Sequence, residues 1–392
     1  MAVDKSILRS IFPRPEQAVF DCIEEKYLSD TLGRRKGRAE ALVFPESTEQ
    51  VSRLLAYAHE NRIPVTPRGA GTNLVGSTVP LDGGIILDLS HMDRILELDR
   101  DTMTITVEPG ILLQDLQRYV EERGLFYPPD PGDKESSIGG NISTNAGGMR
   151  AVKYGVTRDY VRGLEVVLAD GTVLQAGGKC VKDASGLSLK QLFVGSEGTL
   201  AVITKCILRL IPKPETSVSV LVPYADLETG ITSVLAILQA GADPTAVEVI
   251  PRKGGALGER YSGVQYPCPE AGSFILLTFD GRASQVQESA ERVRRVALEH
   301  GAMDYIVLTD PARAADIWRV RGALVKAVEA VSEQEPVDIV VPISKTADFI
   351  AFIHTLEQES GMQMVSFGHA GDGNVHLCVV RGDRDEETWR RE

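Results

Sequence analysis

Two of the six histidines in this chain, His369 and His376, stand seven residues apart in a glycine-rich segment, Ser366–His376. Imidazole nitrogens are good ligands for Zn²⁺, Fe²⁺ or Mn²⁺, and a tight turn can bring both rings onto one ion. The same spacing also occurs where two histidines make structural hydrogen bonds near a turn. The pattern therefore indicates either a divalent-metal site or a structural turn, and spacing alone leaves both open.

A second candidate site is the stretch Pro128–Asp159, which contains the glycine pairs Gly139-Gly140 and Gly147-Gly148. Glycine permits positive φ and lets the backbone approach a ligand closely. The short Asn, Ser and Thr side chains between the pairs supply hydrogen-bonding groups without bulk. This composition predicts a backbone surface that lies against a large, polar, phosphorylated cofactor. The alternative is an irregular loop between domains.

An earlier glycine-rich loop, Pro67–Leu74, favours the cofactor interpretation. It follows an apolar strand, Ile63–Thr66, and successive backbone N–H groups in such a turn form a nest for an anion such as pyrophosphate. Leu74 stands where the dinucleotide-binding Rossmann fingerprint has its third glycine. The loop is therefore predicted to be a phosphate loop of another kind.

The elements that position these loops are predicted from hydrophobic periodicity. Residues 1–40 are expected to be largely helical. A strand at 41–44, a helix with a capping box formed by Ser47 and Gln50, and the strand to Thr66 lead into the first loop. Strands near 84–89 and 104–108, a helix at 113–123, a hairpin around Asp170-Gly171 and a strand at 201–211 complete this region.

The pattern changes after Pro212 and Pro214. Apolar strands at 217–222, 245–250, 274–279, 339–341 and 363–367 alternate with amphipathic helices at 227–238, 284–299, 312–331 and 346–357. This alternation predicts an antiparallel sheet with helices on one face, an α+β arrangement.

Composition narrows the class of protein. A chain of 392 residues is long enough for two domains. The net charge of −13 argues against a nucleic-acid partner. The five cysteines are scattered and never form Cys-x-x-Cys, which is typical of a reducing compartment. No apolar run reaches the about 18 residues of a membrane span, and no signal-peptide pattern is present. A cytoplasmic protein is expected, with contact to the inner membrane only through a partner.

Taken with a third segment, Leu192–Leu200 (LFVGSEGTL), the two glycine-rich stretches resemble the FAD-linked D-lactate dehydrogenase and glycolate oxidase flavoprotein subunit family. The resemblance implies an FAD-binding fold of the p-cresol methylhydroxylase and vanillyl-alcohol oxidase type. The implied architecture is α+β, with a two-part FAD-binding domain at 1–212 and a ferredoxin-like α+β cap at 213–392. The family's C-terminal segment is apparently missing.

The resemblance also implies site residues. FAD should be held without a covalent bond, because Thr72 and Asn73 stand where covalent relatives place a histidine. The implied FAD-binding residues are Pro67, Arg68, Gly69, Ala70, Gly71, Thr72, Asn73, Gly76, Ser77, Pro131, Ser137, Ile138, Gly139, Gly140, Ser143, Thr144, Asn145, Gly147, Gly148, Tyr154, Gly155, Glu197, Gly198 and Ile203.

The segment His-Ala-Gly-Asp-Gly-Asn-Val-His matches the family's metal motif, so His369 and His376 are the implied ligands of Zn, Mn or Fe. Asn374 would orient the substrate or a ligand. Arg321, which follows Trp318 on a predicted helix, matches the family's active-site arginine and would clamp the substrate carboxylate.

The implied reaction is FAD-dependent oxidation of a D-2-hydroxy acid, such as D-lactate or glycolate, to the 2-oxo acid. Electrons would pass to an iron–sulfur subunit, an electron-transferring flavoprotein or a quinone. The family's C-terminal Glu-His-Gly motif is not found; Glu299-His300-Gly301 is interpreted as a helix end. Alternatives are a flavoprotein of the same fold acting on another alcohol, or a catalytically impaired FAD-binding subunit.

Overall fold

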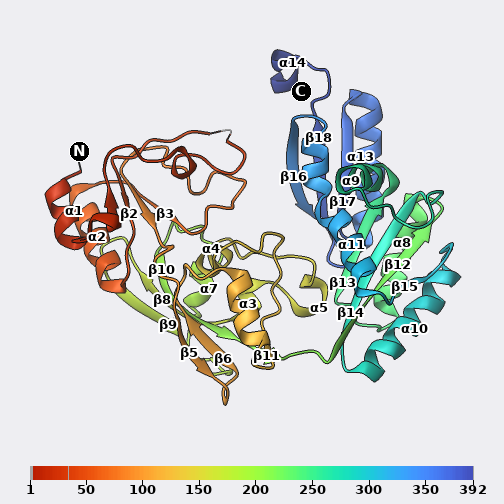
Figure 1. The fold of residues 1–392 in the computed structure, drawn as a ribbon, viewed down its shortest axis with the longest axis horizontal. Coiled ribbons are helices and arrows are strands. Elements are labelled where there is room, and N and C mark those ends of the chain that lie inside the picture. Colours follow the sequence, from red (N-terminus) through yellow and green to blue (C-terminus); the bar gives the residue numbers. More distant parts are fainter. Residues whose placement is uncertain (1–2, 34, 392) are drawn as a thin grey trace. The chain divides into compact units, whose positions relative to one another are not determined.

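The computed structural model describes residues 3–33 and 35–391. It divides into two compact units, the first formed by residues 1–147 and 155–213 and the second by 148–154 and 214–392 (Figure 1). The sequence-based division placed residues 148–154 in the first domain. In the structure this segment, which includes the short helix α5 (Ala151–Tyr154), packs with the second unit.

The first unit begins with a four-stranded sheet in the order β1-β2-β4-β3. Its strands are β1 (Ala18–Val19), β2 (Ala41–Val43), β3 (Val65–Arg68) and β4 (Ile85–Asp88), and β2 and β3 both run parallel to β4. The helices α1 (Lys5–Ile11) and α2 (Thr48–Asn61) pack against this sheet in one apolar core. The Ser47 hydroxyl caps α2 by accepting from the backbone N–H of Gln50, as predicted, but the Gln50 side chain accepts from the backbone N–H of Glu46 at 2.8 Å, so the reciprocal bond of a capping box to Ser47 is replaced.

The expectation of a largely helical N-terminus is wrong. Between residues 3 and 40, outside the undescribed position 34, the chain forms only α1, two short 3₁₀ turns (Pro15–Gln17 and Glu25–Tyr27) and strand β1. Charged residues there give no continuous apolar face that a longer helix could bury.

A five-stranded antiparallel sheet completes the first unit in the order β5-β6-β10-β8-β9. The strands are β5 (Ile95–Asp99), β6 (Thr104–Val107), β8 (Val161–Val167), β9 (Val173–Gly177) and β10 (Val202–Arg209). The β8–β9 hairpin confirms the prediction around Asp170-Gly171. The helices here are α3 (Leu113–Glu121), α4 (Ile138–Ser143), α6 (Thr157–Tyr160) and α7 (Lys190–Phe193), and β7 (Leu125–Phe126) pairs with β11 (Ile211–Pro212).

The second unit is built on a seven-stranded antiparallel sheet in the order β15-β12-β14-β13-β17-β18-β16. The strands are β12 (Thr216–Tyr224), β13 (Ala246–Pro251), β14 (Ser273–Gly281), β15 (Ile306–Leu308), β16 (Gln334–Val340), β17 (Gln363–His369) and β18 (Asn374–Val380). The antiparallel sheet confirms the expected α+β architecture of this region.

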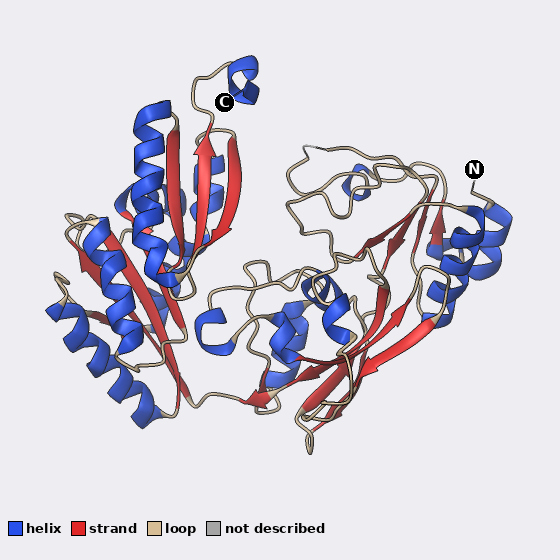
Figure 2. Cartoon of the chain, turned by 180° about the vertical axis from the view of Figure 1, so that it is seen from behind, coloured by secondary structure: helices blue, strands red, loops and turns tan. Residues whose placement is uncertain are grey.

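Helices cover both faces of this sheet, so the prediction of one covered face is wrong (Figure 2). On one face α8 (Leu227–Gln239), α10 (Ala283–Glu299) and α13 (Thr346–Ser360) share a core with Val220 and Val222. On the other, α11 (Pro311–Gly322) and α12 (Leu324–Glu329) share a core with Leu221. Strands that are apolar on both sides need two covering layers. The single helix predicted at 312–331 is divided into α11 and α12 next to Gly322.

A helix that periodicity did not reveal, α9 (Arg252–Ser262), lies against the second face and contains three glycines. A Cβ at Gly258 would stand 2.8 Å from Leu324 Cδ2 and 3.0 Å from Val320 Cγ1. Glycine therefore lets α9 approach α11 and α12 closely, and that packing outweighs its poor helix propensity. A last short helix, α14 (Glu386–Arg391), lies in the charged C-terminal stretch.

The segment 148–154 is fixed to the second unit by a buried carboxylate. Asp280 accepts hydrogen bonds from Tyr154 Oη at 2.8 Å, from Lys153 Nζ at 2.9 Å and from Thr245 Oγ1 at 2.7 Å. Val152 packs against Gly371, whose added Cβ would stand 2.8 Å from Val152 Cγ2. These contacts place the segment against the loop that carries the paired histidines.

Candidate functional site

The first two glycine-rich loops meet in the first unit. The backbone N–H of Ala70 donates to Ser137 Oγ at 3.3 Å, and the same oxygen accepts from Gly140 N at 3.2 Å as the cap of α4. A Cβ at Gly69 would stand only 2.2 Å from this oxygen, so the two loops touch through backbone that has no room for a side chain. Segments 67 residues apart are thus brought together as the cofactor hypothesis requires.

The third segment joins the same cluster. Ser77 Oγ donates to Glu197 Oε2 at 2.8 Å, and the backbone N–H of Glu197 donates to Ser143 O at 2.8 Å. A Cβ at Gly198 would lie 3.4 Å from Pro67 Cγ. All three segments therefore meet in one cluster.

The backbone of this cluster is held in conformations suited to ligand contact. Gly71 has φ +74°, and an added Cβ there would lie within 2.0 Å of the Arg68 guanidinium. Asn145 and Glu197 adopt left-handed φ of 50° and 52°, which is uncommon outside glycine. The side-chain Nδ2 of Asn141 is buried with no hydrogen-bond partner among the described residues. An orphaned donor beside a cradle of bare backbone fits a polar cofactor.

Two of the predicted cofactor residues support the first loop from within. Arg68 is buried and donates to Lys26 O at 2.8 Å and to Thr78 Oγ1 at 3.3 Å. Asn73 donates to the same Thr78 hydroxyl at 2.8 Å and accepts from Ser77 N at 3.2 Å. These side chains shape the loop, and their hydrogen bonds to protein groups are already made.

The other predicted residues divide between the units. In the first unit, Pro131, Ile138, Gly139 and Ile203 are buried, whereas Thr72, Gly76 and Gly155 are half-buried and Thr144 and Gly147 are exposed. Gly148 and Tyr154 belong to the second unit, where Tyr154 is bonded to Asp280.

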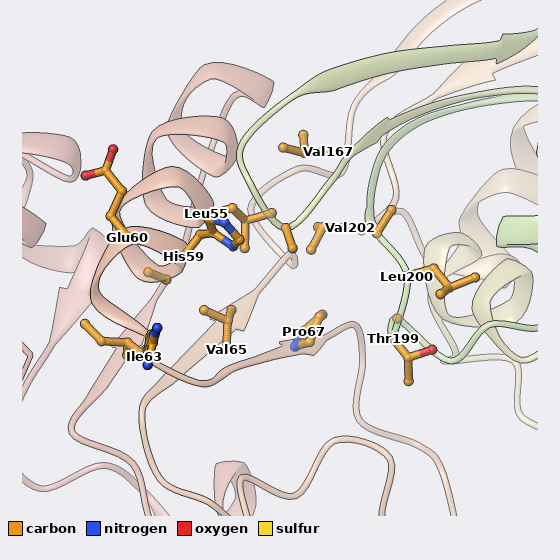
Figure 3. A pocket seen from close by; sticks show the side chains of 15 residues that line it. Leu55, His59, Glu60, Ile63, Val65, Pro67, Val167, Thr199, Leu200 and Val202 are labelled. Carbon is orange, nitrogen blue, oxygen red and sulfur yellow. The ribbon is translucent and has the colours of Figure 1, made fainter. Parts of the chain in front are cut away.

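A cavity of about 690 Å³ lies beside these loops in the first unit (Figure 3). Leu55, Ile63, Val65 and Val202 form apolar walls, and His59, Glu60 and Arg62 at the end of α2 also line it. Two predicted cofactor residues, Pro67 and Gly198, border it. Its volume is in the range of small-molecule pockets.

In the second unit, the strands β17 and β18 bring the paired histidines together. His369 ends β17 and His376 lies on β18, and their Nε2 atoms are 3.3 Å apart. Gly373 makes the connecting turn with φ +83°, where an added Cβ would collide with Val341 O at 2.0 Å. The loop glycines are thus required by the turn that juxtaposes the two rings.

The structure adds a residue that sequence reasoning missed, Glu248 on β13. Its side chain is fully buried, its Oε1 lies 2.7 Å from His369 Nδ1, and its Oε2 lies 2.8 Å from Arg321 Nε and 2.5 Å from Arg321 Nη2. The sequence offered one sign of this residue, because Glu248 is the single acid in the apolar run Ala246–Ile250. A carboxylate is seldom buried without a specific partner.

The pKa values of Glu248 and His376 are both shifted below their ordinary values. Burial on its own raises the pKa of Glu248, but Arg321 and His369 outweigh it and hold that pKa below its ordinary value. Burial lowers the pKa of His376 to about 4, with repulsion from His369 adding to the effect. His376 is therefore neutral at pH 7, the form in which imidazole binds a metal.

Arg321 and Asn374 lie in the same cluster. Arg321 donates a hydrogen bond from Nε to Glu248, and its Nη2 forms an ion pair with the same carboxylate but has no hydrogen-bond partner among the described residues. Asn374 donates from Nδ2 to Asp338 Oδ1 at 2.5 Å, while its Oδ1 is buried without a hydrogen-bond partner among the described residues. His376 Nδ1 lies 3.6 Å from the same Asp338 oxygen.

The Nε2 atoms of His369 and His376 are the candidate donors for a metal ion in this cluster. Within residues 3–33 and 35–391, no group of three or more His, Cys, Asp or Glu side chains is arranged to hold one. The two Nε2 atoms nevertheless fit neighbouring ligand positions, since nitrogen ligands of tetrahedral Zn²⁺ at about 2.0–2.1 Å lie about 3.3 Å apart. Carboxylates next to both Nδ1 atoms are typical of metal-binding histidines. The pair fits two ligands of a divalent cation.

Glu299-His300-Gly301 ends α10, as predicted. His300 is exposed and its Nδ1 contacts Val296 O at 2.8 Å, while Gly301 adopts φ +87° directly after the helix.

None of the described helices is long and apolar enough to cross a membrane.

Comparisons with known proteins agree with this geometry. Residues 39–177 match the family described as FAD binding domain, and residues 213–392 match FAD linked oxidases, C-terminal domain. The chain is 42% identical over 382 residues to a D-lactate dehydrogenase of Anaerostipes hadrus, covering 95% of this chain and 80% of that protein. It is 37% identical over 370 residues to the glycolate oxidase subunit GlcD of Bacillus subtilis, covering 93% and 78%.

Solved structures confirm the fold. p-Cresol methylhydroxylase aligns with a TM-score of 0.80 at 18% identity, covering 98% of this chain and 84% of that chain. An alkyldihydroxyacetonephosphate synthase aligns with a TM-score of 0.79 at 17% identity, covering 99% and 78%. The predicted p-cresol methylhydroxylase-type fold is therefore correct.

Proposed function

This chain belongs to the FAD-linked oxidase family of D-lactate dehydrogenases and glycolate oxidase subunits, and on that premise we propose that it oxidises a D-2-hydroxy acid to the 2-oxo acid. D-Lactate and glycolate are the first candidate substrates. The observation that carries the proposal is the cluster in which His369, His376, Glu248 and Arg321 converge within hydrogen-bonding distances.

Each residue of the cluster has a chemical role in this proposal. FAD, when bound, would supply the acceptor for a hydride from the α-carbon of the substrate, and a divalent cation would polarise the substrate hydroxyl, whose proton would pass to a base. His369 and His376 would hold the cation through their Nε2 atoms. Arg321 binds the substrate carboxylate with the guanidinium edge that Glu248 leaves available. Asn374 Oδ1, which has no donor among the described residues, would accept a hydrogen bond from the substrate or from a ligand of the cation.

The FAD-binding surface is proposed to be the cluster of the three glycine-rich segments in the first unit. The left-handed backbone at Gly71 and the close approach of Gly69 to Ser137 support it. We propose that the bond to FAD is noncovalent, since neither Thr72 nor Asn73 offers an imidazole. Acid precipitation should release the flavin into the supernatant; flavin that stays in the pellet would contradict this.

The electron acceptor is proposed to be a partner protein or a quinone. One similar protein is named as a subunit, the glycolate oxidase subunit GlcD. An iron–sulfur subunit and an electron-transferring flavoprotein are the protein candidates. Oxidation of the reduced protein by a soluble quinone in stopped flow, compared with oxidation by dioxygen, tests whether a quinone alone is sufficient.

The deciding experiment is a substrate screen that follows bleaching of the flavin absorbance without oxygen. D-Lactate, L-lactate, glycolate and D-2-hydroxyglutarate are each added with and without Zn²⁺ or Mn²⁺. Fast bleaching by one D-2-hydroxy acid is expected. Bleaching only by a sugar or other alcohol would favour a different flavoprotein activity, and bleaching by dithionite alone would favour an impaired FAD-binding subunit.

A further inference from the structure

Glu248 is a buried acid within an otherwise apolar strand, and the cost of burying its charge must be offset by specific partners. Its side chain has no exposed surface, and a buried charge is costly unless it is fully paired. The two carboxylate oxygens are used separately. Oε2 faces Arg321 Nε and Nη2, and Oε1 faces His369 Nδ1 at 2.7 Å.

This arrangement determines which nitrogen of His369 carries hydrogen. An ionised carboxylate only accepts hydrogen bonds, and a neutral imidazole has one donor and one acceptor. Nδ1 must therefore donate to Glu248, and in the neutral ring this leaves a lone pair on Nε2. Arg321 can only donate, so it keeps Glu248 in the accepting, ionised form. The lone pair of His369 Nε2 then points toward His376 Nε2, 3.3 Å away.

The second histidine is supported less firmly. Asp338 Oδ1 is 3.6 Å from His376 Nδ1 and also accepts from Asn374 Nδ2, and the Asp338 side chain is 68% exposed. Solvent and the competing donor Asn374 Nδ2 therefore weaken the interaction between Asp338 and the His376 ring. The two rings differ in how rigidly the protein sets their tautomer and orientation.

We infer that Glu248 is a positioning residue that fixes His369 as the rigid half of the histidine pair, while His376 is the adjustable half. The inference rests on the proposed function in that the pair is taken to bind a divalent cation. Arg321 thereby gains a second role: one edge of its guanidinium holds Glu248 in place for His369. Carboxylates that orient a ligating histidine typically contribute about 10–100-fold to metal affinity.

The test uses the FAD-bound protein, labelled with ¹⁵N-histidine, after a chelator has removed any divalent metal. Ring ¹⁵N chemical shifts distinguish an imidazole that carries hydrogen on Nδ1 from one that carries it on Nε2. With His369→Ala used only to assign the signal, wild-type His369 should show hydrogen on Nδ1. Wild-type His369 with hydrogen on Nε2 overturns the inference, with no variant needed.

Glu248→Gln is the matching variant, because its amide can also donate and no longer enforces one tautomer. The Nδ1–H form of His369 should decline, and Zn²⁺ affinity measured by calorimetry should fall about 10–100-fold. Asp338→Asn should change Zn²⁺ affinity less. Equal losses from the two variants, or an unchanged His369 spectrum in Glu248→Gln, would contradict the inference. If Glu248→Gln does not fold, Glu248→Asp keeps the charge and should lower Zn²⁺ affinity by shortening the reach to Nδ1.

The experiment separates this inference from the proposed function. If wild-type protein binds no Zn²⁺, the cation of the proposed function is refuted, but the tautomer of His369 is still measured. If Zn²⁺ binds and the tautomer is the wrong one, the proposed function stands and the role of Glu248 fails.

Discussion

Glu165 and Lys205 face each other across the antiparallel pair β8 and β10, with Lys205 Nζ 2.9 Å from Glu165 Oε2. The same carboxylate accepts from Thr48 Oγ1 at 2.6 Å, Gln175 Nε2 at 2.6 Å and Thr204 Oγ1 at 3.0 Å. It therefore links helix α2 to the five-stranded sheet. Burial on its own raises the pKa of Glu165, but these hydrogen bonds outweigh it and hold that pKa below its ordinary value.

The first prediction concerns acid stability. Since the folded pKa of Glu165 lies below the unfolded value of about 4.3, its stabilisation is complete above that pH and declines as pH falls through the folded pKa. Glu165→Gln should lower the free energy of unfolding by about 1–3 kcal/mol at pH 7, and the difference from wild type should shrink below about pH 4. Urea unfolding between pH 3.5 and 7 measures it. The exposed Glu299→Gln is the control; a difference that stays constant to pH 3.5 would contradict the prediction.

The second prediction concerns the first glycine-rich loop. Gly71→Val should abolish retention of FAD, because φ +74° is unfavourable for a β-branched residue and the new Cβ would meet Arg68. A left-handed residue costs about 1–2 kcal/mol, which corresponds to about a 5–30-fold loss of affinity, and the clash with Arg68 adds to this loss. Gly140→Val should act more mildly, since its Cβ would meet only Ser137 Oγ at 3.0 Å. The flavin-to-protein ratio after gel filtration is the measurement.

Gly178→Ala is the matched control in this unit, since no described residue other than its chain neighbours comes within 4 Å of its added Cβ and its φ is not left-handed. It should keep the wild-type flavin ratio. If Gly71→Val keeps it as well, that loop does not contact FAD.

The third prediction concerns Gly371, between the paired histidines. In Gly371→Ala the new Cβ would stand 2.8 Å from Val152 Cγ2 and 3.1 Å from Val247 Cβ, both in packed surroundings. Overpacking of this kind costs about 1–3 kcal/mol. FAD should remain bound, while substrate-driven flavin reduction slows and urea unfolds the second unit earlier. Gly322→Ala, with no atom within 4 Å, should be neutral or slightly stabilising; equal stability of the two variants would refute the clash.

The fourth prediction concerns the histidines themselves. His369→Ala and His376→Ala should keep FAD and its reduction by dithionite, but should lose Zn²⁺ binding and slow reduction by substrate at least about 100-fold. His300→Ala should behave as wild type, because His300 is exposed and its Nδ1 bonds Val296 O of its own helix. Elemental analysis beside stopped-flow reduction measures both effects. Equal reduction rates in all variants would remove the pair from the reaction.

The sequence was most informative where chemistry is contiguous in the chain. The loop from His369 to His376 closes within a single turn between adjacent strands, so the two rings could be singled out together from the sequence, although their spacing left a metal site and a structural turn both open. The three glycine-rich segments were recognisable because bare backbone is itself the feature that a cofactor needs. The antiparallel sheet of the second unit followed from its regular alternation of strands and helices.

The missed features depend on contacts between distant segments. Glu248 lies 121 residues from His369, and one acid in an apolar strand does not reveal its partner. Helix α9 was hidden by its glycines, which are favourable only because Val320 and Leu324 lie so close. The second layer of helices required knowing that both faces of the sheet are apolar, and alternation read along single strands does not show this.

The second unit is not a continuous piece of the chain, since residues 148–154 enter it and the chain then returns to the first unit until residue 213. A gene fragment beginning at residue 214 would therefore encode a second unit that lacks part of its packing. Asp280 would lose its hydrogen bonds with Lys153 and Tyr154, and Gly371 would lose its contact with Val152. Recombination between relatives would meet the same obstacle. An exchange of the C-terminal half alone separates residues 148–154 from the residues they pack against, so working chimaeras need matched residues at 148–154 as well as a junction near 213.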